Sequence, residues 1–235
     1  MPPDGQPDSS RGHAVVTGAS SGIGAAIVTR LLQDGWSVTG LSRTAADIVA
    51  PSFQHRAVDL LEVHPGDLRA ALADIPATAL VHAAGVLRVG ELGGLDREAG
   101  ALMWRLHVDS AALLADMLAP RMGVGGRIVL IGSRTAGGSA GRSQYAASKA
   151  ALVGLARSWA IELAPRGITV NVIAPGATET PMLRDPARAG VAPRLPPSGR
   201  FVQPDEIAAV AAFLLSEAAC SITGQQIVVC GGASL

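Results

Sequence analysis

The chain has 235 residues, a formal net charge of zero at pH 7 and only 16% charged residues. This length suits one α/β domain with a sizeable core, and the charge balance offers no basic field to nucleic acid or to an anionic membrane. We therefore expect a small uncharged partner. Two cysteines, Cys220 and Cys230, make neither a disulfide framework nor a zinc site, so we expect a reducing compartment.

The N-terminal residues are rich in proline, glycine and serine, and they lack the basic start and apolar core of a signal peptide. No apolar run approaches the length that spans a bilayer. We therefore expect a flexible lead-in over residues 1–11, one domain over residues 12–235, and a cytoplasmic protein without a membrane or nucleic-acid partner.

Residues 13–17 predict a short buried strand, followed by a glycine-rich turn and a helix that ends near Gly35. Glycines permit close approach of a pyrophosphate, which the helix N-terminus attracts. A structural turn alone explains the glycines about as well, but their place in the first β-α unit favours a dinucleotide site. The residues assigned to the cofactor here are Gly18, Ser20, Ser21, Gly22, Ile23 and Gly24.

A second strand is predicted over residues 36–41, and the adenosine ribose of a dinucleotide lies at the end of such a strand. NAD-binding chains usually place an acid there. This chain has Ser42, Arg43 and Thr44, which favour the 2′-phosphate of NADP. The alternative is that Arg43 is an ordinary surface cation.

The middle of the chain predicts one short helix after Arg43, a strand over residues 54–58, a helix over residues 66–73 and a strand over residues 78–81. His82 follows that strand and is interpreted as a strand-end residue, because no metal-ligand partner lies near it in sequence. Small residues that let the backbone approach a ligand come next: Ala83, Ala84 and Gly85.

A long helical pattern over residues 96–122 contains His107 and is interrupted by Pro120. A buried strand over residues 127–132 follows, and Ser133 ends it. Its hydroxyl should therefore point into the crevice where open α/β sheets bind ligands.

Tyr145 and Lys149 are one helical turn apart in the next helix, so they share a face. A free tyrosine titrates near pH ~10, and a nearby cation lowers that pKa by stabilising the phenolate. Such a pair is commonly a half-buried aromatic with a snorkelling neighbour. Its position shortly after Ser133 makes Tyr145 the candidate acid or base.

The last part of the chain predicts strands over residues 168–173 and 226–229 and a helix from Pro204. Pro175 and Gly176 should turn the chain out of the sheet. Residues 181–203 are irregular, and a loop of this length is often a lid. Its arginines either meet an anionic substrate or are solvated, and solvation is favoured: Arg184, Arg188, Arg194 and Arg200.

Together these motifs resemble the short-chain dehydrogenase/reductase family from about His13 to Gly232. The resemblance implies a Rossmann-type α/β fold, a doubly wound parallel sheet of about seven strands with helices on both faces. It also implies that Asp59, with Leu60 beside it, holds the adenine. The segment that meets the nicotinamide carboxamide would contain Pro175, Gly176, Thr178 and Thr180.

The resemblance further implies that Tyr145 gives a proton to a carbonyl oxygen, that Ser133 hydrogen-bonds that oxygen, and that Lys149 grips the cofactor's ribose hydroxyls. His107 stands where the family usually has an asparagine that kinks the helix and holds a water on the proton path. A histidine either holds that water or relays the proton itself. Cys230 stands in place of a usual aspartate, for which we expect a packing or subunit-contact change.

These residues predict an NADP(H)-dependent oxidoreductase that interconverts a ketone and a secondary alcohol, mainly by reduction and of a 3-oxoacyl-reductase-like kind. One alternative is an NAD-dependent dehydrogenase of an alcohol, polyol, steroid or cyclic diol; another is a cofactor-sensing protein without catalysis. The family also implies a homo-oligomer, a tetramer or dimer built through the helices near Leu106 and Leu155. Core packing explains the same apolar faces.

Overall fold

A parallel sheet of seven strands forms the centre of the computed structural model, which describes residues 11–185 and 194–235. The strand order is β3-β2-β1-β4-β5-β6-β7. The strands are β1 (His13–Thr17), β2 (Ser37–Ser42), β3 (Phe53–Ala57), β4 (Ala79–His82), β5 (Arg127–Ile131), β6 (Thr169–Pro175) and β7 (Gln226–Val229). The order reverses between β1 and β4, and an open α/β sheet leaves a ligand crevice at the carboxyl ends of such a pair.

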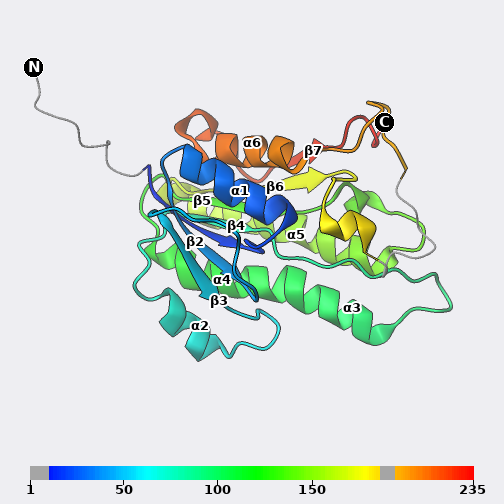
Figure 1. Cartoon of the computed structure of the whole chain (residues 1–235), viewed down its shortest axis with the longest axis horizontal. Helices are drawn as coiled ribbons and strands as arrows, with labels where there is room; N and C mark the ends of the chain where they lie inside the picture. The colour runs from blue at the N-terminus through cyan, green and yellow to red at the C-terminus, as the bar shows by residue number, and fades with distance from the viewer. Residues whose placement is uncertain (1–10, 186–193) are drawn as a thin grey trace, which may run out of the picture.

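Helices cover both faces of the sheet. Figure 1 shows α1 and α6 on one side, and α2, α3, α4 and α5 on the other. Their bounds are α1 (Gly22–Gln33), α2 (Pro65–Leu72), α3 (Arg97–Trp104), α4 (Ser110–Leu118), α5 (Ser143–Leu163) and α6 (Pro204–Leu215). The predicted Rossmann-type arrangement is therefore confirmed. No helix in the described part of the chain combines the length and the apolar character that crossing a membrane requires.

The central strands are apolar on both faces because each face meets a helix layer. Along β1, Val15 packs into the core under α2, α4 and α5, whereas Val16 packs into the core under α1 and α6. Along β4, Leu80 and Val81 divide in the same way. Each fully buried side chain of this size contributes roughly 1.5–3 kcal/mol relative to exposure. The sequences of these strands are therefore near-continuous apolar runs, without the alternation of polar and apolar residues seen in a half-exposed strand.

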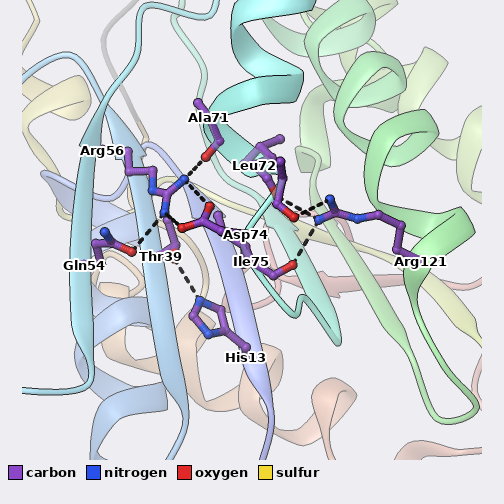
Figure 2. Close-up of polar contacts among 10 residues, drawn as sticks. His13, Thr39, Gln54, Arg56, Ala71, Leu72, Asp74, Ile75 and Arg121 are labelled. Atoms are coloured by element: carbon purple, nitrogen blue, oxygen red, sulfur yellow. Dashed lines mark hydrogen bonds and ion pairs between the residues drawn. The ribbon is translucent and has the colours of Figure 1, made fainter.

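Two arginines from other elements hold the C-terminus of α2 (Figure 2). Arg56 on β3 donates to the Ala71 carbonyl oxygen and makes two bonds to the Asp74 carboxylate, at 2.9 and 2.7 Å. Arg121, in the 3-10 turn after α4, donates to the Leu72 carbonyl oxygen at 2.8 Å. Cations stabilise the negative end of a helix. These contacts tie a short helix to the edge strand and to its neighbouring helix.

The short helix predicted after Arg43 is wrong, because residues 43–52 contain no helix. Ile48 instead packs against the core on the α1 and α6 side. Pro51 disfavours helical backbone in the residue before it, and no large apolar residue stands at helical spacing from Ile48. The segment therefore crosses to β3 as an irregular connection.

The long helix predicted over residues 96–122 is interrupted earlier than Pro120 suggests. Between α3 and α4, Arg105–Asp109 form a π-helical turn, in which the Ser110 N–H donates to the Arg105 carbonyl oxygen. Pro120 lies in a 3-10 turn beyond α4. A π turn inserts one extra residue into a helix, and such turns are frequent at functional sites. Here the turn carries His107.

Candidate active site

A cavity of about 950 Å³ lies at the carboxyl ends of the central strands. All four predicted catalytic residues line it: Ser133, Tyr145, Lys149 and His107. So do most of the predicted cofactor residues, namely Gly18, Ser21, Gly22, Ile23, Gly24, Ala83, Ala84, Gly85, Pro175, Gly176, Thr178 and Thr180. The cavity lining does not include Ser20, Ser42, Arg43, Thr44, Asp59 or Leu60.

Tyr145 and Lys149 face one another across the first turns of α5. The Lys149 Nζ lies 6.0 Å from the centroid of the Tyr145 ring and donates to the Ile131 carbonyl oxygen at 2.8 Å. The lysine is almost fully buried, and this desolvation lowers the pKa of Lys149 to about 7. Close to neutral pH, an oxygen ligand or anion beside Nζ would therefore change its protonation.

Ser133 follows β5 and caps the 3-10 turn Arg134–Gly137. Its Oγ accepts a hydrogen bond from the Thr135 N–H at 3.1 Å and lies 2.8 Å from the Thr135 Oγ1. These bonds hold the Ser133 oxygen in the wall of the cavity. The hydroxyl proton can still rotate toward a second acceptor. The serine is buried, as a residue at a strand end in a crevice should be.

His107 is positioned by the π turn with its ring edge-on to Tyr145, at 5.6 Å between centroids and 85° between planes. The Val86 N–H donates to His107 Nε2 at 3.1 Å, so the ring proton must lie on Nδ1. Nδ1 then donates to the Ser148 Oγ at 2.9 Å, and that hydroxyl donates to the Tyr145 carbonyl oxygen at 2.9 Å. Both ring nitrogens of His107 thus form hydrogen bonds within the protein. This favours a role for His107 in positioning the neighbouring residues over a role as a proton relay.

His82 belongs to a second network that the sequence did not reveal. The Thr17 hydroxyl donates to His82 Nδ1 at 3.0 Å, and His82 Nε2 donates to the Leu106 carbonyl oxygen in the π turn at 3.1 Å. The Thr17 Oγ1 also accepts the N–H groups of Ala83 and Ala84, each at 3.0 Å. His82 is therefore structural, as its strand-end position predicts, and it ties β1 and β4 to the π turn.

Both histidines should make the protein sensitive to acid. Burial lowers the pKa of His82 to about 3 and, with the nearby Lys149 charge, holds the pKa of His107 well below 6.5. In the unfolded chain each binds a proton near its ordinary pKa of 6.5. Between these values the unfolded state binds more protons, so stability falls as pH falls, by about 1.4 kcal/mol per pH unit for each histidine.

Urea unfolding at pH 7 and at pH ~5 measures this loss. His107→Asn should shrink the difference between the two free energies of unfolding, because one titrating group is removed. Equal stability at the two pH values would show that the buried histidines do not titrate in this range.

The turn between β1 and α1 fits the phosphates of a dinucleotide. Ser21 precedes α1 but makes no side-chain capping bond, so it leaves the first N–H groups of the helix to another acceptor. A Cβ atom on Gly24 would collide with the Gly18 carbonyl oxygen. Only glycine allows the helix to start this close to the strand, and the residues present fit the group that the sequence predicts.

The end of β2 presents one cation to solvent. The Ser42 hydroxyl donates to the Thr44 carbonyl oxygen at 2.8 Å, and His55 on the neighbouring strand lies 3.1 Å from the same hydroxyl. These bonds fix the turn that carries Arg43. Arg43 is exposed and forms no hydrogen bond or ion pair with the residues that the structure describes. Its guanidinium is therefore available to a ligand.

The arginines of the predicted lid divide into two kinds. Arg184 pairs with Glu179 at 2.6 Å, and Arg200 pairs with Glu206 at 2.7 Å, all outside the cavity lining. Arg194 lines the cavity, and Arg188 lies outside the described residues.

Two further arginines line the cavity, in a loop over residues 134–144 that the sequence places at the substrate pocket without giving either arginine a role: Arg134 and Arg142. Arg134 follows Ser133, and Arg142 is the residue before α5. Their proximity in sequence to the candidate catalytic residues was the available signal.

Cys230 lies beside the cavity, where its backbone packs against Gly176; a Cβ on that glycine would lie 2.9 Å from the Cys230 Cα. Burial raises the pKa of Cys230, but hydrogen bonds from Ser234 and from the backbone of the following turn outweigh it and lower the pKa. The thiol thus accepts bonds from a tight turn. This is a packing role, one of the two changes expected at this position.

Comparison with known proteins agrees with this geometry. A family model described as enoyl-(acyl carrier protein) reductase matches residues 18–234. The chain is 38% identical to the 3-oxoacyl-[acyl-carrier-protein] reductase FabG of Escherichia coli strain K12, with 93% of this chain and 96% of that protein covered. The corresponding protein of Salmonella typhimurium is 36% identical with the same coverage.

Among solved structures, a short chain dehydrogenase from Burkholderia cenocepacia in complex with NADP superposes with a TM-score of 0.87. It is 33% identical, and the match covers 96% of this chain and 99% of that one. Sequence and structure agree over nearly the whole length. The chain therefore belongs to the short-chain dehydrogenase/reductase family of oxidoreductases, which act on CH–OH and C=O groups.

Proposed function

We propose that this enzyme uses NADPH to reduce a ketone to a secondary alcohol, with a substrate of the 3-oxoacyl type. The observation that carries the proposal is the convergence of Ser133, Tyr145 and Lys149 on one cavity that also contains the glycine turn. The names of the FabG relatives and the NADP held by the Burkholderia neighbour support the substrate type and the cofactor.

The cofactor would be held by the β1–α1 turn and by Thr178 and Thr180, and when bound it supplies the hydride. Tyr145 donates a proton to the carbonyl oxygen, which becomes the alcohol oxygen, and Ser133 donates a hydrogen bond to the same oxygen. A charged Lys149 beside the ring favours the phenolate that remains. His107 acts through backbone: it holds Val86 in the cavity wall and, through Ser148, the start of α5.

The preference for NADPH follows from the end of β2. Arg43 is exposed on a turn fixed by Ser42, and a charge-assisted bond to a 2′-phosphate is worth about 1.5–3 kcal/mol, or roughly 10- to 150-fold in affinity. Arg43→Ala should therefore weaken NADPH binding by roughly that factor and leave NADH binding unchanged. Calorimetric titration of both cofactors measures the two dissociation constants.

The exposed Arg69 on α2 provides the control, since Arg69→Ala should leave both constants unchanged. If wild-type enzyme binds NADH as tightly as NADPH, Arg43 is a bystander. The NAD-dependent dehydrogenase of an alcohol, polyol or cyclic diol then becomes the better account.

The homo-oligomer implied by the family stays a prediction. Trp104 on α3 and Ile161 on α5 are large apolar side chains with 45% and 77% of their surface exposed, and an interface along these helices would cover them. Light scattering in solution would measure the mass; a monomer at micromolar concentration would reject the prediction.

A further inference from the structure

We propose that the substrate is an anion: a ketone that also carries a carboxylate or phosphate, bound by arginines that line the cavity. The proposal rests on the proposed function and adds a substrate class to it. It also departs from the uncharged partner that the overall composition suggests.

The first observation is the charge of the cavity wall. Four cationic residues line it, and no aspartate or glutamate does among the residues that the structure describes: Arg134, Arg142, Lys149 and Arg194. Residues 186–193 contain no acid in their sequence either. Since the whole chain has a formal charge of zero, the rest of the protein carries four more negative charges than positive ones. The positive charge is concentrated in the cavity, where a low dielectric strengthens its field.

The second observation concerns Arg134 and Arg194 in this wall and the acids closest to the lid. Glu179 pairs with Arg184, and Asp185 lies 3.7 Å from Arg88; neither acid lines the cavity. Arg134 and Arg194 form no ion pair with any residue in the described ranges.

The third observation is the position of two arginines relative to the reacting groups. Arg134 directly follows Ser133, and Arg142 stands three residues before Tyr145. The backbone at Arg142 is held by pairing with Gly90, whose N–H donates to the Gly141 carbonyl oxygen at 2.9 Å. Both arginines thus neighbour a reacting residue in sequence and line the same cavity as the serine and the tyrosine, and guanidinium groups match carboxylate and phosphate oxygens. The anionic group of a substrate in this cavity would meet these guanidinium groups.

The test compares 3-oxohexanoate with its methyl ester, which has the same carbonyl and no charge. Wild-type kcat/KM should favour the acid by about 10-fold or more. Arg134→Gln, Arg142→Gln and Arg194→Gln should each lower the value for the acid several-fold and leave the ester unchanged. Arg184→Gln, in the same lid but outside the cavity, should change neither. An ester reduced as well as the acid would overturn the proposal.

Two further measurements separate the possible failures. NADPH dissociation constants should be the same in all these variants; weaker NADPH binding with an unchanged acid-to-ester ratio would assign the arginines to the cofactor and overturn the proposal. If neither compound is reduced although NADPH binds, the proposed function fails. Binding of 3-oxohexanoate and its ester to the Tyr145→Phe enzyme with NADPH, followed by cofactor fluorescence, then decides the anion preference without turnover.

Discussion

Replacing Tyr145 by phenylalanine should lower kcat by roughly 100- to 10,000-fold, which is the usual contribution of a positioned acid or base. The ring stays, so its edge contact with His107 and the packing of α5 are preserved. Only the proton that reaches the carbonyl oxygen is lost. NADPH binding should change little, and the rate of NADPH oxidation at saturating ketone measures the effect.

Tyr145 is the only tyrosine in the chain, so no second phenol can take its place. Turnover within a few-fold of wild type would remove Tyr145 from the mechanism. A wild-type protein that binds NADPH and reduces nothing in a broad panel of ketones, both charged and neutral, would point instead to a cofactor sensor.

Gly24→Ala is expected to abolish cofactor binding and to destabilise the fold. The added Cβ would collide with the Gly18 carbonyl oxygen and lie 3.2 Å from the Thr17 carbonyl oxygen. Both obstacles are backbone, so α1 must move away from β1. Overpacking typically costs about 1–3 kcal/mol, and rigid backbone on both sides places this case at the upper end. Urea unfolding and NADPH titration measure the two effects.

Gly154→Ala is the matched control. Gly154 lies in α5, where an added Cβ would meet nothing within 4 Å. Alanine in a helix interior is favoured over glycine by roughly 0.8–1 kcal/mol, so this variant should be as stable as wild type or more so. A Gly24→Ala protein that matches it in stability and binds NADPH normally would mean that the turn relaxes more easily than its geometry indicates.

The sheet was predictable because its central strands are buried on both sides and therefore appear as short apolar runs, as β5 does. The run ending at Ser133 corresponds to β5, and the run over residues 226–229 corresponds to β7, an edge strand that is partly exposed. Local patterns failed where tertiary contacts decide the backbone. The π turn at Arg105–Asp109 depends on His82, which donates to the Leu106 carbonyl oxygen from another element. No periodicity in the helix itself reveals that bond.

The candidate site was predictable where chemistry and spacing coincide, as at Tyr145 and Lys149. It was not predictable where a role depends on what surrounds a residue. Arg134 and Arg200 look alike in sequence, yet one lines the cavity and the other pairs with Glu206 on the surface. Likewise, the near-neutral pKa that makes an ordinary histidine a proton relay is removed at His107 by burial. Burial is a property of the folded chain, not of a short segment.

The hydrogen bonds of Thr17 and His82 and those of His107 form two networks of protein groups that meet at the π turn and together join β1, β4 and α5. The conformational entropy of ordering these strand ends is therefore lost when the chain folds. A dinucleotide therefore meets preorganised backbone donors, and its binding free energy is not reduced by the cost of ordering them. This preorganisation also couples distant positions: a change at any one of the three residues should alter the tolerance for changes at the other two.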